Sequence, residues 1–143
     1  MTSVNQLLKH KGHFVWSVAP NASVYEALEF MAEKDVGALV VLRDGELVGI
    51  FSERDYARKV ILKDKSSKDT PVREIMTEKV YYVKPDQIVE DCMALMTEKR
   101  IRHLPVVDDD QVVGLISIGD LVKSIISEQK FMIEQLEQYI TGR

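Results

Sequence analysis

The sequence has very little cysteine: Cys92 is the only one among 143 residues. A single thiol cannot form an intrachain disulfide or a cysteine-based metal cluster, so an apolar core must hold the fold together. Cys92 lies between Val89 and Met96 on a segment whose spacing predicts an apolar helix face, where a thiol acts as a small buried hydrophobic group. This cysteine usage is what a reducing cytosol permits.

Long hydrophobic runs and an excess of positive charge are missing too. No window approaches 18 consecutive apolar residues, and residues 1–11 lack the apolar core of a signal peptide, so we expect a cytoplasmic protein without a membrane partner. The net charge is −4 and the pI is about 5.4, whereas a protein that binds nucleic acid usually presents a cationic face. We therefore expect no nucleic-acid partner.

An internal repeat at a constant offset of 65 residues organises the chain. Residues 15–60 align with residues 80–125 without a gap, and 14 of these 46 positions are identical. Each copy has an extended segment, a turn with Pro20 or Pro85, an amphipathic helix, two β-branched runs and a second helix. We therefore predict an α/β (α+β) fold of tandem β-α-β-β-α repeats. The predicted parts are repeat 1 (residues 12–62), a polar linker (63–71), repeat 2 (72–126) and a C-terminal helical extension (127–143).

Two apolar runs in each copy predict a β-hairpin, and Asp44-Gly45 is a strong two-residue turn signal between the first pair. One turn of helix is predicted at 72–76. We expect a flexible start to the chain, with His10 and His13 exposed to solvent. The predicted strands are 13–18, 38–42 and 47–51 in the first copy and 80–83, 104–107 and 112–116 in the second.

The last helix continues past the repeat and carries Met132, Leu136 and Tyr139 on one apolar stripe. One interpretation is that this stripe docks on the protein's own core. The other, which we favour because the repeated unit leaves nothing to cover it, is a contact between subunits. We therefore expect a homodimer.

A seven-residue motif, Gly-x-x-Ser-x-x-Asp, occurs at 49–55 and again at 114–120, where a strand is predicted to end and a helix to begin. Ser-x-x-Asp is a capping-box pattern, which by itself explains both polar residues. The alternative is a ligand site, because a helix N-terminus offers amides to a phosphate and a carboxylate can accept from both hydroxyls of a ribose.

The 65-residue duplication, the strand 104–107 (Leu-Pro-Val-Val) with its acidic turn, and the doubled motif together resemble CBS domains, and the pair resembles stand-alone CBS (Bateman) modules. The resemblance covers residues 12 to 126. It implies two repeats packed about a pseudo-twofold axis, leaving two clefts that hold AMP, ADP, ATP, NAD or S-adenosylmethionine. Among these compounds, we expect AMP to be the regulatory ligand.

The resemblance implies two ligand sites. The first combines Ile50 for adenine packing, Ser52 for a hydroxyl or phosphate and Asp55 for ribose with Tyr81, Arg102 and His103 of the opposite repeat. The second combines Leu115, Ser117 and Asp120 in the same roles with Trp16, Gly37 and Ala38. Because Arg102 offers a planar fork of donors and Gly37 at the matching position offers none, we expect the first site to bind phosphate better.

The sequence shows no nucleophile paired with a histidine, no glycine-rich phosphate loop and no metal-ligand spacing. We therefore expect no enzymatic activity, no catalytic cofactor and no metal. The leading hypothesis is a regulatory module that senses an adenine nucleotide and signals to an unidentified protein in trans. The alternative is a structural or interaction module that binds no ligand and dimerises through its CBS faces and its last helix.

Overall fold

The computed structural model describes residues 1–142, and these fall into two compact units. Unit 1 consists of residues 1–14, 82–108 and 113 onward, and unit 2 of residues 15–81 and 109–112. Unit 1 thus contains most of the second sequence repeat, and unit 2 contains the first. The α/β class predicted from the sequence is confirmed, because both units combine a small sheet with helices.

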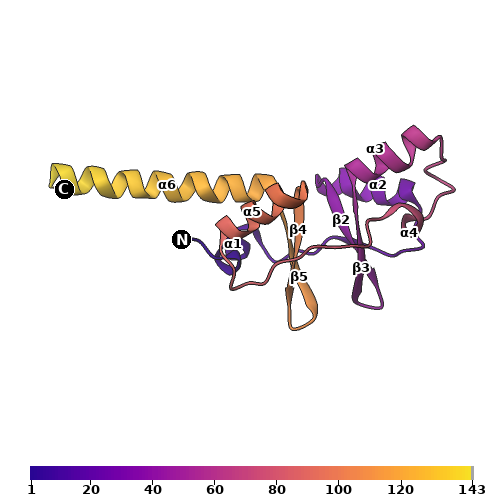
Figure 1. The fold of residues 1–143 in the computed structure, drawn as a ribbon, viewed down its shortest axis with the longest axis horizontal. Helices are drawn as coiled ribbons and strands as arrows, with labels where there is room; N and C mark the ends of the chain where they lie inside the picture. Colours follow the sequence, from indigo (N-terminus) through magenta and orange to yellow (C-terminus); the bar gives the residue numbers. More distant parts are fainter. Residues whose placement is uncertain (143) are drawn as a thin grey trace. The chain divides into compact units, whose positions relative to one another are not determined.

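Unit 2 has a three-stranded sheet of order β1-β2-β3, in which β1 runs parallel to β2 and β2 runs antiparallel to β3. The hairpin of β2 and β3 is labelled in Figure 1. Its core joins the helix residues Val24 and Met31 to the strand residues Leu39 and Phe51, all of them buried. The elements are β1 (Ser17–Val18), α2 (Val24–Lys34), β2 (Ala38–Arg43), β3 (Glu46–Ser52), α3 (Glu53–Lys59), the 3-10 helix η1 (Ile61–Lys63) and α4 (Val72–Ile75).

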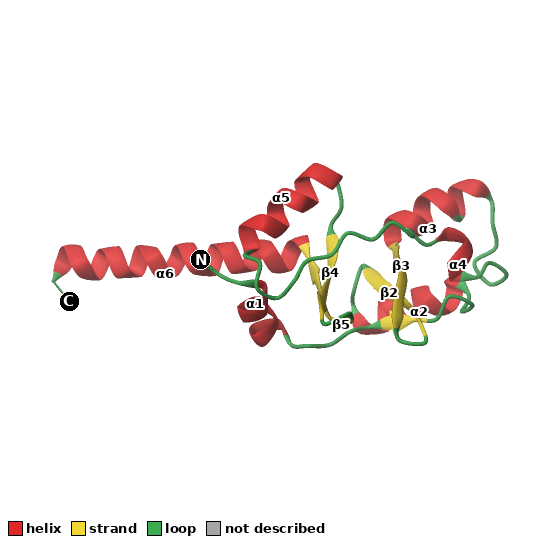
Figure 2. Cartoon of the chain, turned by 60° about the horizontal axis from the view of Figure 1, so that its bottom comes forward, coloured by secondary structure: helices red, strands yellow, loops and turns green. Residues whose placement is uncertain are grey.

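Unit 1 has a two-stranded sheet, β4-β5, with three helices (Figure 2). Val83 forms an isolated parallel bridge with Val106, where the sequence predicted a longer strand over 80–83. The elements are α1 (Val4–Lys11), α5 (Val89–Lys99), β4 (His103–Asp108), β5 (Gln111–Ser117) and α6 (Ile118–Thr141).

The hairpin turns follow the sequence signals. Asp44 and Gly45 have φ of 51° and 83°, and Asp109 and Asp110 have φ of 51° and 62°. Positive φ at both central residues is the geometry of the turn that matches the twist of a hairpin. Glycine reaches it freely, and aspartate tolerates it better than most residues, which explains why acidic residues stand at both turns.

The segments just before the aligned stretches 15–60 and 80–125 each pack on the other copy of the repeat. Ile50 and Thr77 exchange two backbone hydrogen bonds of 2.9 Å, which attaches the chain after α4 to β3 of the first repeat. In the same way the Val4 amide donates to the Gln87 carbonyl at 2.8 Å, which attaches α1 to the second repeat. The compact units therefore do not begin where the sequence repeats begin.

The expectation of a flexible start to the chain was wrong. Residues 4–11 form helix α1, which begins with a capping box between Ser3 and Gln6 and buries Val4, Leu7 and Leu8. The apolar face of this helix completes the core of unit 1, which a repeat alone does not fill. His10 and His13 are exposed, as expected.

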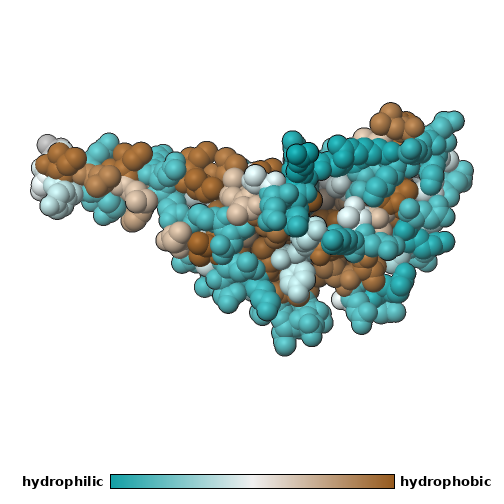
Figure 3. Space-filling model, in the orientation of Figure 1, coloured by the Kyte–Doolittle hydropathy of each residue, from teal (hydrophilic) through white to brown (hydrophobic). Residues whose placement is uncertain are grey.

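Helix α6 continues well past the contacts that its first half makes with α1 and α5 in unit 1 (Figures 1 and 3). Met132, Leu136 and Tyr139 are 56%, 59% and 86% exposed, so within residues 1–142 the stripe does not dock on the chain's own core. Despite this apolar surface, none of the helices in residues 1–142 combines the length and apolar character needed to cross a bilayer.

Candidate ligand-binding site

Both copies of the Ser-x-x-Asp motif form a capping box at the start of a helix. At α3, Ser52 Oγ accepts from the Asp55 amide at 3.3 Å and the Ser52 amide donates to Asp55 Oδ2 at 3.0 Å. At α6, the matching distances between Ser117 and Asp120 are 3.2 and 2.8 Å. The capping interpretation is therefore confirmed at both sites.

The first amide of each of these helices is also occupied. The Glu53 amide donates to the Gly37 carbonyl at 3.1 Å, and the Ile118 amide donates to the Arg102 carbonyl at 2.9 Å. Gly37 and Arg102 are equivalent in the 65-residue repeat, so both copies use the same backbone cap. Because three of the first four backbone amides at each helix start already have partners, the helix N-termini have little left to offer a phosphate.

The two motif carboxylates differ in how many partners they have. Asp55 Oδ2 accepts from the amide and, at 3.1 Å, from the hydroxyl of Ser52. Its Oδ1 accepts from the Thr77 hydroxyl at 3.0 Å and pairs with Lys59 Nζ at 2.9 Å. The side chain is only 8% exposed. Both oxygens of Asp55 are thus bonded twice, and an added hydroxyl would have to displace one of these partners.

Asp120 has fewer partners and is more accessible. Its Oδ2 accepts from the Ser117 amide and pairs with Lys11 Nζ at 2.6 Å, whereas its Oδ1 has no partner among residues 1–142. The side chain is 20% exposed. The Lys11 ammonium also donates to the Leu115 carbonyl. One oxygen of Asp120 is therefore free to accept from a ligand hydroxyl.

The pKa of Asp120 reflects this environment. Burial alone would raise it, but the hydrogen bonds from Lys11 and Ser117, together with the positive charge of Lys11, hold the pKa below the ordinary value for aspartate. Asp120 is therefore ionised at neutral pH and acts only as a hydrogen-bond acceptor.

Sequence reasoning missed Lys11, Lys59 and Thr77, the three side chains from outside the motif that contact its carboxylates. The two segments that carry Lys11 and Thr77 share an apolar pattern at an offset of 68, because Val4-x-x-Leu7-Leu8 matches Val72-x-x-Ile75-Met76, but Lys11 and Thr77 are not equivalent in this alignment. Each copy lies in the segment that packs against the opposite repeat. Lys59 has no such signal, because the matching residue of the second copy is a serine.

The other residues of the expected sites lie in both units. In unit 2, Trp16 packs edge-on against Phe30 at 5.9 Å between ring centroids, with Lys34 Nζ 4.5 Å from the Trp16 ring. Lys79 Nζ lies 5.7 Å from the Tyr81 ring. Ile50 is half-buried within β3, and Ala38 is buried at the start of β2. In unit 1, Arg102 is exposed, His103 is half-buried and Leu115 is buried. The expected pairing of residues from the two units in one site stays a prediction.

No group of three or more His, Cys, Asp or Glu side chains within residues 1–142 is placed to hold a metal ion. The groups at the motif positions that can contact a ligand are carboxylate and hydroxyl oxygens and the ammonium groups of the neighbouring lysines. Such groups bind hydroxyls and anions.

The chain was compared with known proteins. The family model "CBS domain" matches residues 13–62 and 72–127. The mitochondrial CBS domain-containing protein CBSX3 of Arabidopsis thaliana is 41% identical over 99% of this chain and 73% of its own length.

Solved structures agree with this match. A protein with CBS domains from Burkholderia ambifaria, described as a putative signal-transduction protein, superposes with a TM-score of 0.86 at 55% identity, over 90% of this chain and 96% of that one. The CBS domain pair of MJ0100, solved with 5-methylthioadenosine and S-adenosylmethionine, superposes with a TM-score of 0.80 at 27% identity, over 90% of this chain and 98% of that one. This chain belongs to the CBS domain family and contains a pair of CBS domains.

Proposed function

We propose that the chain is a regulatory module that binds an adenosine-containing ligand and transmits its binding to a partner protein. The observation that carries the proposal is the carboxylate of Asp120, which is ionised, partly exposed and keeps one oxygen without a partner among residues 1–142. Such a group can accept a hydrogen bond from a ribose hydroxyl. The similar MJ0100 pair was solved with two adenosine compounds, which supports this ligand class.

In this proposal Asp120, with Ser117, is the first ribose-binding site to fill. This order reverses the expectation based on Arg102, because the sequence pattern did not show that Lys59 and Thr77 occupy the carboxylate of Asp55. A ligand at Asp120 needs to displace at most Lys11, whose side chain is 34% exposed. A ligand at Asp55 must break a buried network.

A thermal-shift screen tests the function. Purified protein is heated with AMP, ADP, ATP, NAD or S-adenosylmethionine, with GMP as the control. A ligand at about 100 times its dissociation constant adds about 2.7 kcal/mol to the free energy of unfolding, which raises the Tm by several degrees in a domain of this size. A shift with adenosine compounds alone supports the proposal, and no shift with any of them contradicts it.

A second candidate is an interaction module that works without a ligand, and the exposed stripe of α6 favours it. Met132, Leu136 and Tyr139 are exposed and follow the spacing of four and three residues that is typical of helices that pair with another helix. We propose that this stripe joins two copies of the chain in a homodimer. The two candidates are compatible, because a sensor needs a surface through which to signal.

A further inference from the structure

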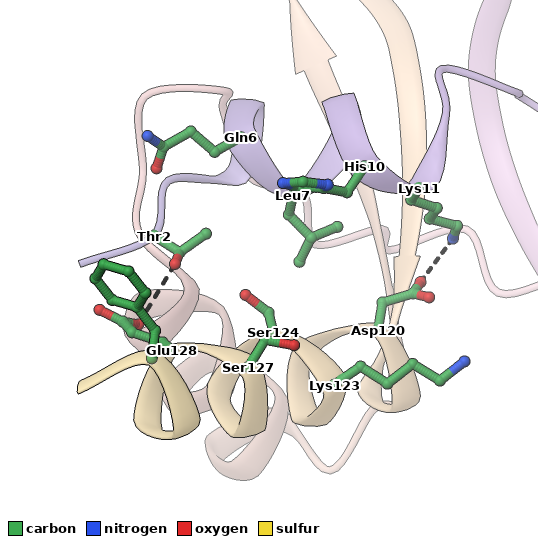
Figure 4. A pocket seen from close by; sticks show the side chains of 11 residues that line it. Thr2, Gln6, Leu7, His10, Lys11, Asp120, Lys123, Ser124, Ser127 and Glu128 are labelled. Atoms are coloured by element: carbon green, nitrogen blue, oxygen red, sulfur yellow. Dashed lines mark hydrogen bonds and ion pairs between the residues drawn. The ribbon is translucent and has the colours of Figure 1, made fainter. Parts of the chain in front are cut away.

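Two opposite faces of helix α6 have different surroundings. One face belongs to the interior of unit 1, where Ser124 and Ser127 line a groove between α6 and α1 (Figure 4). The other face is apolar and exposed, and Figure 3 shows apolar residues along the end of the helix. This exposed face of α6 contains Val122, Ile126, Met132, Ile133, Leu136, Tyr139 and Ile140.

The centre of the exposed face is a column of residues seven positions apart. Val122, Gln129 and Leu136 have this spacing, which brings side chains back to nearly the same side of an α-helix. The column is flanked on one side by Ile126, Ile133 and Ile140 and on the other by Met132 and Tyr139. A seven-residue repeat of this kind is typical of helices that pair along their length as a coiled coil.

Gln129 is the polar member of the central column. It is exposed in the single chain, but a partner on this face would bury it. A buried side-chain amide costs free energy unless it is hydrogen-bonded, so a purely apolar partner surface would leave Gln129 unsatisfied. A second copy of α6 that is parallel and in register places its own Gln129 opposite. Each side-chain carbonyl can then accept from the amide of the other copy.

The antiparallel direction does not satisfy Gln129. In an antiparallel pair of helices each layer joins a residue of the central column to one of a flanking column. Gln129 would therefore lie against Ile133 or Met132 of the second copy, and both amides would be buried without a partner. A single polar residue in an apolar seam thus selects both the direction and the register of pairing.

We propose that two copies of the chain pair through α6 in parallel and in register, with Gln129 of one copy bonded to Gln129 of the other. The inference rests on the homodimer proposed above and adds its direction and register. Each central residue then meets its own counterpart across the twofold axis. Both copies of unit 1 lie at the same end of this helical pair.

Oxidative cross-linking of the full chain tests the arrangement. Gln129→Cys and Leu136→Cys each place a thiol in the central column, and Gln138→Cys places one on the opposite side of the same helix as the matched control. Cys92 is buried, so the wild type provides the background. A disulfide needs the two Cα atoms within about 7 Å of each other. Electrophoresis without reductant follows the linkage, at a concentration where sedimentation shows the wild type to be a dimer.

We expect Gln129→Cys and Leu136→Cys to form linked dimers at least about 10-fold faster than Gln138→Cys, because pairing raises the effective concentration of the two thiols. The wild type should form none. Adding Gln129→Leu to Leu136→Cys should slow its linkage about 2-fold or more, because antiparallel pairs can form once the amides are gone.

Three results would overturn the inference and leave the homodimer in place. The first is equal linkage of all three cysteine variants. The second is rapid linkage in a mixture of Gln129→Cys with Ile133→Cys but not in Gln129→Cys alone, which would show an antiparallel pair. The third is no effect of Gln129→Leu on the linkage of Leu136→Cys. If the wild type sediments as a monomer, the proposed homodimer fails and this inference fails with it.

Discussion

Lys11 Nζ lies 2.6 Å from Asp120 Oδ2, so an ion pair joins helix α1 to the second motif across 109 positions of sequence. The same ammonium donates to the carbonyl of Leu115, which lies in β5 two residues before the motif serine. A residue that precedes the first repeat therefore holds the motif of the second. This contact gives the N-terminal helix a direct influence on the carboxylate that we expect to bind the ligand.

Replacing Lys11 with glutamine should raise the pKa of Asp120, because the change removes both a hydrogen bond and a positive charge. A carboxyl whose pKa is lowered by folding stabilises the protein above its unfolded pKa, near 3.9, and this contribution is lost as the pH falls through the native pKa. Lys11→Gln should therefore lose about 0.5–1 kcal/mol at neutral pH, as expected for a partly exposed pair, and less in acid.

Denaturant unfolding at several pH values measures this difference. Lys130→Gln, on the same unit but outside the ion pair, is the control and should follow the wild type. Parallel pH profiles for the wild type and Lys11→Gln would show that the ion pair does not hold the pKa down.

The two motif aspartates should differ in their importance for stability. Asp55→Asn disturbs a buried carboxylate with four partners and should cost about 2–3 kcal/mol. Asp120→Asn disturbs a more exposed cap and one ion pair and should cost about 1 kcal/mol. Urea unfolding of both variants makes the comparison, and equal losses would argue against different roles for the two residues.

Each motif glycine allows a close contact with the segment that precedes the opposite repeat. A Cβ at Gly49 would lie 2.6 Å from Met76 Sδ and 3.1 Å from the Thr77 carbonyl oxygen, and a Cβ at Gly114 would lie 2.7 Å from Leu8 Cδ2. Gly49→Ala and Gly114→Ala should therefore each destabilise the protein by about 1–3 kcal/mol.

A double-mutant cycle identifies the cause. Met76→Ala should recover part of the loss in Gly49→Ala, because it removes the clashing side chain but leaves the Thr77 carbonyl in place. Strictly additive losses would mean that the clash is not with Met76.

Cys92 should be almost unreactive in the folded protein. Burial of the side chain, followed by the negative charge of Asp91, raises the pKa of the thiol to about 11, so very little thiolate exists at neutral pH. An aromatic disulfide reagent should modify it only as fast as the protein opens, and at once in denaturant. Rapid stoichiometric modification without denaturant would contradict the buried position of this thiol.

Leu136→Glu should dissociate the proposed homodimer, because it places a charge in the exposed apolar stripe of α6. Gln138→Glu adds the same charge elsewhere on the helix and serves as the control. Sedimentation equilibrium measures the mass of each variant. A monomeric wild type, or equal dissociation of both variants, would exclude the stripe as a subunit contact.

The sequence alone determined the repeated architecture of this protein. The 65-residue offset indicated the duplication, and local signals indicated its elements: the acidic turns, the period of the helices and the capping boxes at Ser52 and Ser117. These features depend on residues close together in the chain. The helices and hairpins therefore appeared nearly where they were expected, and the match to the CBS family followed.

Only the tertiary structure decided how the duplicated motif differs between its two copies. The motif residues are identical, but Asp55 is surrounded by Lys59 and Thr77 whereas Asp120 meets Lys11 alone. Thr77 and Lys11 come from segments that lie 22 and 109 positions away, and no local pattern reveals that these segments pack on the opposite repeats. Apolar packing around Leu8 in unit 1 and around Ile75 in unit 2 brings Lys11 and Thr77 to the motif carboxylates. This packing therefore determines how accessible each carboxylate is.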